Sequence, residues 1–333
     1  MELPGSTPMP GSLDSWQRLA EKVKDPPRVL LDMLRSLGDF ARLNPSDDGR
    51  FHLICRREGS DRSLQWFCTD PSGFIAQRTS SCRSTVAFSA TLSPLSHFRE
   101  LLGLSTDETE QLTVHYPFPE ENLGVWVDPR VDTRWSSRVS TADMLSRRLS
   151  GIYLSAPGTW LVFLPSFSYL ELIRSRLASA GLPVIAQTSG MSPAGREEFL
   201  EELTASGRLA LVVSGGIFAE GVDIRSDLLR GAVVVGPSLP GMDLSSRLLV
   251  ESYREKGCDG FLHALAIPGM VRVIQAAGRL VRSPADRRVL VLMGRRFTRE
   301  PYFDLLPSHW FRDGWLPVLS DGMDEIGKFF AGT

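Results

Sequence analysis

Apolar positions in the second part of the chain alternate between short continuous runs and longer stripes at helical spacing. The runs predict buried strands at residues 123–127, 160–164, 183–186, 209–213, 232–235 and 289–292. The stripes predict helices between them, at residues 141–153, 166–180, 193–203 and 270–281. This alternation is typical of a doubly wound, mostly parallel α/β sheet. Ligands bind such sheets at the carboxyl ends of the strands, so the residues that follow each strand are the first candidates for chemistry.

The first part of the chain follows another pattern. Leucines at helical spacing predict a pair of helices over residues 13–43, and stretches near 51–55 and 64–68 predict strands. A short apolar run at 86–88 predicts a further strand, followed by a helix at 95–102. The pattern becomes regular after about Thr106, so residues 1–108 and 109–333 are expected to be separate domains. Residues 237–269 are expected to be an insertion that carries a helix near 244–256.

Composition excludes two classes of protein. With 42% hydrophobic and 23% charged residues, the chain is expected to be soluble and globular and not largely disordered. Its apolar runs are shorter than the ~18 residues that a membrane-spanning helix needs. The amino terminus has neither the basic patch nor the apolar run of a secretory signal. A cytoplasmic location is therefore expected.

Charge and cysteine content indicate which ligands and metal sites to expect. The net charge is −2, from 37 basic and 39 acidic residues, so the whole chain has no bias toward nucleic acid, although a local basic channel stays possible. Nearly all the basic residues are arginine, which suits bidentate binding of phosphate. The four cysteines are too widely spaced for a zinc or iron–sulfur site. Ordinary thiols in a reducing compartment are expected instead.

A glycine-rich stretch follows the strand predicted at 209–213. It reads SGGIFAEGVDI from Ser214, and its glycines, including Gly221, let the backbone approach a ligand. Two carboxylates, Glu220 and Asp223, lie within it. A functional loop and a plain turn with solvated acids are both open on this stretch alone.

The helix predicted at 270–281 carries a second candidate. Gln275, Arg279 and Arg282 are spaced i, i+4 and i+7, so they would project from one face of that helix. Two guanidinium groups on one stripe repel each other unless an anion lies between them, and phosphate is the expected anion. A solvated helix face is the alternative. Weaker candidates are the hydroxyls at two other strand ends, Ser166 and Thr91.

Taken in order, these stretches resemble the XPD/DinG-like branch of superfamily 2 DNA helicases. VAFSATLSP from Val86 is similar to motif III, WLVFLPSF from Trp160 to motif IV, SGGIFAEGVDI from Ser214 to motif V, and QAAGRLVRSPADR from Gln275 to motif VI. The resemblance covers roughly residues 65 to 300. It implies a RecA-like, P-loop NTPase-type second motor domain, with residues 1–108 as the trailing part of the first.

Several family elements are absent from this sequence. The phosphate-binding loop requires Gly-Lys followed by Ser or Thr, but the only Gly-Lys pair, Gly327-Lys328, is followed by Phe329. No Asp-Glu pair follows an apolar strand, and the family's iron–sulfur cysteines are missing. The family also often has an Asp before the arginine in the stretch that here reads Met293 to Arg296, so a local ion pair is not implied there. The chain alone is therefore expected not to hydrolyse ATP.

The resemblance assigns roles to the candidate residues. Arg282 is the expected arginine finger, Arg279 a second phosphate ligand, and Gln275 with Gly278 part of the nucleotide site. Glu220, Gly221 and Asp223 would couple that site to DNA, and Thr91, Ser166 and Ser214 would contact the phosphates of single-stranded DNA. ATP and Mg²⁺ would bind only with the missing first motor domain. Two alternatives stay open: a regulatory or nucleic-acid-binding module without catalysis, and a RecA-like enzyme of another type.

Overall fold

The computed structural model describes residues 49–218 and 227–332, together with the isolated positions Arg28, Asp32, Arg35, Ser36, Gly38 and Phe40. The chain divides into two compact units, residues 1–73 and 74–333. Most of the helical pair predicted over 13–43 lies outside the described residues, as do Glu220, Gly221 and Asp223. The domain boundary near residue 108 stays a prediction.

The first unit contains an antiparallel hairpin of β1 (Phe51–Glu58) and β2 (Asp61–Cys68). Its two-residue turn includes Gly59, whose φ of 61° is the left-handed conformation that a tight hairpin turn needs. Both strands extend beyond the stretches predicted for them. Helix α3 (Ser72–Thr79) follows, and its first turn is held by Asp70, which accepts from the Ser72 N–H at 3.1 Å.

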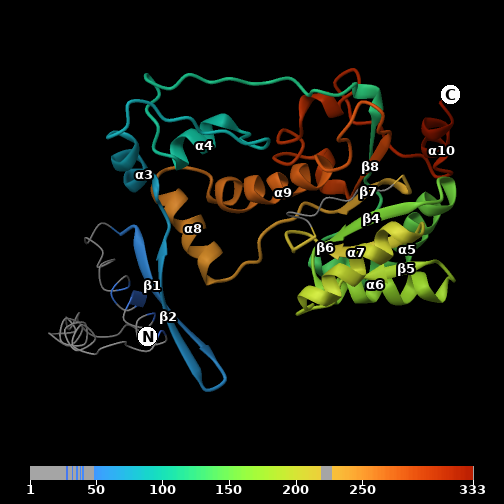
Figure 1. The fold of residues 1–333 in the computed structure, drawn as a ribbon, viewed down its shortest axis with the longest axis horizontal. Helices are drawn as coiled ribbons and strands as arrows, with labels where there is room; N and C mark the ends of the chain where they lie inside the picture. The colour runs from blue at the N-terminus through green and yellow to red at the C-terminus, as the bar shows by residue number, and fades with distance from the viewer. Residues whose placement is uncertain are drawn as a thin grey trace. The chain divides into compact units, whose positions relative to one another are not determined.

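The second unit is built on a six-stranded sheet in which every neighbouring pair is parallel. Its strands, in chain order, are β3 (Leu123–Asp128), β4 (Thr159–Leu164), β5 (Val184–Ala186), β6 (Leu209–Val213), β7 (Leu229–Val235) and β8 (Arg288–Met293). In space the order is β3-β8-β7-β4-β6-β5 (Figure 1). This confirms the parallel sheet and all six strands predicted for it.

Helices precede, connect and follow these strands. They are α4 (Leu95–Leu101), α5 (Arg138–Ser155), α6 (Phe167–Ser179), α7 (Pro193–Ala205), α8 (Leu244–Glu255), the π-helix η3 (Leu262–Ala266), α9 (Ile267–Ala277) and α10 (Asp324–Ala331). Three begin at a capping side chain: Ser166 for α6, Ser192 for α7 and Asp243 for α8. Within the described residues, no helix combines the length and apolarity needed to cross a bilayer.

The sheet separates two apolar cores. Trp160, Val162 and Leu164 of β4 face one core, which α5, α6 and α10 complete. Leu161 and Phe163 face the other, which α7, α9 and the chain after β8 complete. Figure 1 shows α5 and α6 together on one side of the sheet and α9 on the other. Strands buried on both faces explain the continuous apolar runs in the sequence.

The carboxyl end of β3 is fixed by the chain near the carboxyl terminus. The Val127 N–H donates to the Pro317 carbonyl at 2.8 Å, and the Leu319 N–H donates to the Val127 carbonyl at 2.9 Å. The next residue, Asp128, is fully buried and forms an ion pair with Arg148 of α5. These contacts position the loop that follows β3.

Residues 80–115 contrast with the sheet. The strand predicted at 86–88 does not form, because this stretch has no ladder partner in the described part of the chain. Its Val86 and Phe88 side chains are 81% and 89% exposed. Helix α4 follows, one residue shorter than predicted.

Candidate functional site

All six parallel strands end at one edge of the sheet, which we call the carboxyl edge. It is defined by the last residue of each strand: Asp128, Leu164, Ala186, Val213, Val235 and Met293. Neighbouring parallel strands place their following loops side by side, so residues distant in sequence meet there.

Ser166, predicted to contact DNA, lies at this edge directly after β4. Its hydroxyl accepts from the Tyr169 N–H at 3.3 Å and so caps α6. The same oxygen lies 3.4 Å from Nη1 of Arg138, the first residue of α5. The first residue of α5 and the chain after β4 therefore meet at this hydroxyl.

Asp132 organises the loop after β3. Its carboxylate accepts three hydrogen bonds from the Arg134 guanidinium, at 3.1, 3.0 and 2.6 Å, and one from the Ser137 hydroxyl at 3.1 Å. Arg295, which follows β8, lies 3.8 Å from the same carboxylate. The Arg134 hydrogen bonds are the main reason that the pKa of Asp132 is well below its usual range. Asp132 is thus ionised and partly neutralises two arginines of this edge.

Two other arginines, Arg138 and Arg296, form what we call the arginine pair. Arg296 donates from Nη2 to the Thr133 hydroxyl at 3.3 Å, and Arg138 points Nε at the Thr133 carbonyl at 3.4 Å. Within the described residues, neither guanidinium has a carboxylate within 4.0 Å. Burial lowers the pKa of Arg138, and the positive charge of Arg296 lowers it further. Two like charges held near one residue without a carboxylate favour an anion.

A glycine after β7 allows this close packing. Gly236 has a φ of +75°, and a Cβ there would lie 2.6 Å from the Thr133 hydroxyl oxygen and 3.3 Å from Nη2 of Arg296. A larger residue would push Thr133 and Arg296 apart. The VVVGPSLP stretch therefore contributes its glycine to the carboxyl edge.

Ser214 lies at the end of β6 but is less accessible than its position suggests. Its N–H donates to the Leu164 carbonyl at 2.8 Å, and its hydroxyl is buried with no hydrogen-bond partner in the described residues. Gly215, the next residue, has a φ of +71°. A contact from the Ser214 hydroxyl to DNA stays a prediction, and it would require a local rearrangement.

The motif VI residues do not lie on one helix. Helix α9 ends at Ala277, and the predicted helix to residue 281 is wrong there. Gly278 caps the helix and is exposed, so Arg279 and Arg282 follow in an irregular loop and only Gln275 projects from α9. The i, i+4, i+7 argument for a shared face therefore fails for the two arginines.

Arg282 is held by the loop instead. Its Nε donates to the Arg279 carbonyl at 3.1 Å, and its backbone N–H donates to Asp286 at 3.0 Å. Burial would raise the pKa of Asp286, but backbone N–H groups of Arg282 and Ser283 and the charge of Arg288 lower it overall. This carboxylate anchors the backbone that carries Arg282.

Gln275 meets a predicted DNA contact from a distant part of the sequence. Its Nε2 lies 3.5 Å from the Thr91 hydroxyl, which also lies 3.3 Å from the Ser89 hydroxyl. Thr91 is 8% exposed. The motif III and motif VI stretches, 184 residues apart, are thus in contact. The motif V residues Glu220, Gly221 and Asp223 lie outside the described residues.

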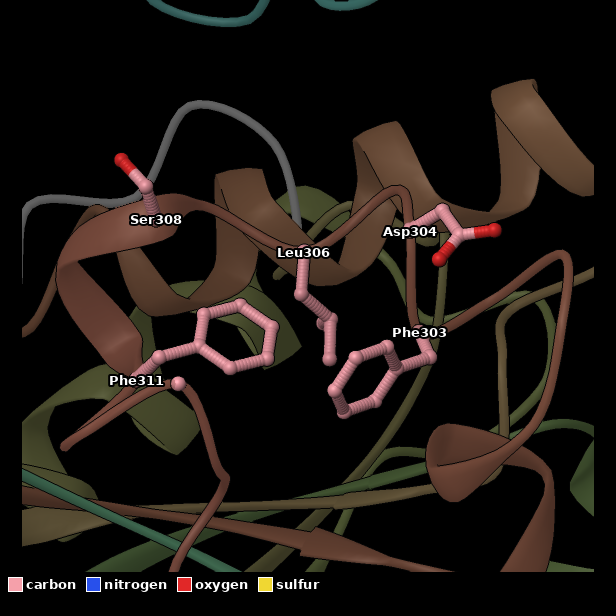
Figure 2. Close-up of a pocket in the computed structure, with 6 residues that line it drawn as sticks. Phe303, Asp304, Leu306, Ser308 and Phe311 are labelled. Atoms are coloured by element: carbon pink, nitrogen blue, oxygen red, sulfur yellow. The ribbon is translucent and has the colours of Figure 1, made fainter.

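A cavity of about 420 Å³ lies elsewhere, in the chain after β8. Figure 2 shows Phe303, Leu306 and Phe311 turned toward one another, while the polar groups of Asp304 and Ser308 point away. The two phenylalanine rings are edge to face at 5.0 Å. No predicted site residue lines this cavity.

Several residues of the carboxyl edge were missed by sequence reasoning. Thr133 and Asp132 follow a strand, which was the available signal, but no motif marks them. Arg296 belongs to a stretch noted only for a departure from the family pattern. Its role depends on the spatial neighbours β7 and β3, which the order of the strands in the sequence does not reveal.

Comparison with known proteins supports the interpretation of these motifs as those of a helicase. The helicase C-terminal domain family matches residues 149–313. The mouse (Mus musculus) ATP-dependent DNA helicase DDX11 is 24% identical over 80% of this chain and 34% of its own length. The Escherichia coli ATP-dependent DNA helicase YoaA is 28% identical over 66% of this chain and 34% of its own length. The chain thus spans about a third of these relatives.

Solved structures support the fold. An XPD helicase structure shares 20% identity with a TM-score of 0.59, covering 83% of this chain and 49% of that chain. Another XPD structure, without ligand, has a TM-score of 0.61. The sheet of residues 123–293 is therefore a RecA-like α/β fold of the kind found in the second motor domain of helicases. Residues 149–313 of this chain match the helicase C-terminal domain family, and the chain is similar to about a third of the DDX11 and YoaA helicases.

Proposed function

We propose that this chain is the C-terminal portion of an ATP-dependent DNA helicase, which couples ATP hydrolysis to translocation on single-stranded DNA. The observation that carries this is the contact between Gln275 and Thr91. It joins the motif VI helix to the motif III stretch, which resembles the end of the first motor domain. ATP would bind where these two domains face each other.

In this proposal Arg282 is the arginine finger. Charge spreads over the γ-phosphoryl oxygens in the transition state, and an arginine supplied across a domain interface can raise turnover by about 10³ to 10⁵. Asp286 accepts a hydrogen bond from the Arg282 backbone N–H and so fixes the position from which the Arg282 side chain extends. Arg279 would bind the same phosphate, or the motif V acid Asp223, and Gln275 would report nucleotide state to Thr91. The first motor domain would supply the lysine and hold Mg²⁺.

Exposed apolar side chains support a missing partner domain. Val86 and Phe88 are 81% and 89% exposed, and Leu112 and Val114 are 86% and 79% exposed. Such side chains normally pack in a core or an interface. We propose that the first motor domain covers them.

The alternative function is a nucleic-acid-binding module without catalysis. The arginine pair at the carboxyl edge favours it, because that pair could hold a phosphate backbone with no nucleotide bound. The two functions differ in whether ATP turnover returns when the first domain is supplied.

The test is an ATPase assay of this chain alone and of the chain joined to the first motor domain of its full-length protein. The chain alone should give background turnover with or without single-stranded DNA, and the joined protein should give DNA-stimulated turnover. Arg282→Ala in the joined protein should lower turnover by about 1000-fold or more with little change in ATP affinity, whereas Arg279→Ala should weaken both. Arg287→Ala, an exposed arginine of the same loop, is the control.

Three results would contradict the proposal or part of it. Robust turnover by the chain alone would show that it needs no first domain. Near-normal turnover of the Arg282→Ala protein would remove the finger assignment and leave Arg279 as the candidate. No turnover by the joined protein, with DNA binding intact, would favour the module without catalysis.

A further inference from the structure

We propose that Trp135 and the arginine pair form a subsite for one nucleotide of a single strand, with the base stacked on Trp135 and its phosphate between Arg138 and Arg296. This rests on the proposed function, because it requires single-stranded nucleic acid at the carboxyl edge. It adds a base contact that none of the sequence motifs contains.

The Trp135 side chain is largely exposed to solvent. It begins the short 3₁₀ helix Trp135–Ser137 between β3 and α5 and is 75% exposed. Tryptophan side chains are normally mostly buried, because burial of the large apolar indole ring is favourable. The Trp135 ring gains little of this stabilisation in the chain alone. The guanidinium of Arg138 lies 5.1 Å from the ring centroid. An exposed aromatic ring beside a cation is the arrangement on which single-stranded bases stack.

The backbone under Trp135 is fixed before any ligand binds. The Ser137 N–H donates to the Arg134 carbonyl at 2.9 Å, closing the 3₁₀ turn. The Ser137 hydroxyl donates to Asp132, and the Thr141 hydroxyl donates to the Asp132 carbonyl at 2.9 Å. A rigid support reduces the entropy that a ligand must lose on binding. Asp132 thus positions the ring as well as binding two neighbouring arginines.

Arg138 is held on several sides. Its guanidinium carbon lies 5.1 Å from the Trp135 ring and 5.3 Å from the Tyr169 ring, and Nη1 lies 3.4 Å from the Ser166 hydroxyl. These contacts orient the guanidinium but leave its charge unbalanced, because each is to a neutral group. Burial is the main cause of the lowered pKa of Arg138, and the charge of Arg296 adds to it while Tyr169 opposes it.

Arg296 faces the same space from the loop after β8. It packs against the Tyr302 ring at 5.9 Å and donates to Thr133, and its Nε is buried without a hydrogen-bond partner in the described residues. Arg134 and Arg295 of the same edge lie near the Asp132 carboxylate. Of these four arginines, Arg134 and Arg295 are partly neutralised by a carboxylate, whereas Arg138 and Arg296 have none within 4.0 Å in the described residues.

The ligand that fits is an anion attached to a flat aromatic group. Inorganic phosphate would satisfy the arginines and leave Trp135 exposed. The bases of a duplex are already stacked on their neighbours, so a single strand is favoured. Stacking is tolerant of sequence, as a motor that moves along any strand requires.

The experiment compares two fluorescent 15-nucleotide probes, oligo(dT) and an abasic strand of the same length, against the full chain. Trp135→Ala should weaken oligo(dT) binding roughly tenfold and leave abasic binding unchanged, because only the first probe has bases to stack. The control is Trp315→Ala, since Trp315 is 74% exposed and lies in the segment before α10. It should bind both probes as the wild type does.

The arginines should behave differently from the tryptophan. Arg296→Gln and Arg138→Gln should weaken both probes equally and reduce the slope of log affinity against log salt by about 0.7 for each lost phosphate contact. Arg174→Ala is the control, because Arg174 is exposed and already bonded to Glu171 at 2.8 and 2.6 Å. Thermal unfolding of each variant identifies any loss caused by misfolding.

The outcomes separate the subsite from the proposed function. If the wild-type chain binds neither probe, single-strand binding by this chain is wrong. If the wild type binds but Trp135→Ala, correctly folded, binds oligo(dT) equally well, the base platform is wrong. If Trp135→Ala weakens the abasic probe as much as oligo(dT), Trp135 acts on the backbone and the stacking assignment is overturned.

Discussion

Two parts of the second unit differ in the burial of their apolar side chains. In the sheet, Phe163 of β4 is 1% exposed and its strand is buried along its whole length. In residues 80–115, Phe88 is 89% exposed and the only buried side chains are the polar Thr91 and His97. The sheet is held by its own core, whereas residues 80–115 are held by a few polar contacts. The difference is the one expected under the proposal that a first motor domain covers the exposed apolar side chains of residues 80–115.

The polar contacts of residues 80–115 reach one continuous helical run. Thr91 contacts Gln275 of α9, and His97 of α4 contacts His263 of η3, with the two Nδ1 atoms 2.9 Å apart. Tyr253 of α8 stacks on His263 at 5.0 Å. The segment can therefore be loosened at these points without disturbing the sheet.

The largest expected effect is a matched pair of truncations. Phe163→Ala should lower the free energy of unfolding by about 3 to 5 kcal/mol, because it leaves a cavity in a closed core. Phe88→Ala should change it by less than about 0.5 kcal/mol in this chain, because the ring is already in water. Denaturant unfolding of both variants measures the difference.

The same pair sharpens the comparison when the first motor domain is joined. Phe88→Ala should then become destabilising, because the proposed partner would bury the ring. If Phe88→Ala destabilises the chain alone as strongly as Phe163→Ala, residues 80–115 have a core of their own and the comparison is wrong.

Much of the sheet could be predicted from the sequence. Strands such as β4 and β6 are buried on both faces. Their sequences are therefore continuous apolar runs bounded by turn residues. The strand predicted at 86–88 has the same local pattern, yet it has no ladder partner among the residues that the structure describes. A strand requires a neighbour, and that information is not in the local sequence.

The candidate site was less predictable. Ser166 and Gln275 lie where the sequence placed them, next to a strand end and on a helix. The end of α9 was wrong, because helical spacing continues past Ala277 while the backbone turns at Gly278. The arginine pair could not be foreseen, since Arg138 and Arg296 meet only through the strand order β3-β8-β7-β4. Residues 219–226, which include the motif V acids, lie outside the described part of the chain.

The next effect concerns the histidine contact and pH. Burial, and then the charge of His263, lower the pKa of His97 from 6.5 to about 4. The folded segment favours neutral His97, so this contact stabilises α4 fully above pH 6.5 and loses its effect as the pH falls from 6.5 toward 4. The loss should be at most about 3 kcal/mol. Hydrogen exchange of residues 95–101 at pH 7.5 and pH 5, corrected for intrinsic rates, should show protection falling in α4 while β4 is unchanged.

A variant tests the cause of that fall. His97→Leu should make protection of α4 independent of pH over this range, whereas His115→Gln, at an exposed histidine of the same segment, should keep the wild-type dependence. Equal pH dependence in the wild type and in His97→Leu would assign the effect to another group.

The smallest effect is expected at Thr91. Thr91→Val keeps the side-chain shape but removes the hydroxyl that lies 3.5 Å from Nε2 of Gln275. Because this distance is long for a hydrogen bond and Gln275 is half-buried and reaches water, the loss should be about 1 kcal/mol or less. Hydrogen exchange of residues 89–92 measures it, with the exposed Thr113→Val as control. If Thr91 and His97 stabilise the segment independently, the losses of protection in Thr91→Val and His97→Leu should add in the double variant. Equal protection in the double variant and in His97→Leu would mean that one contact depends on the other.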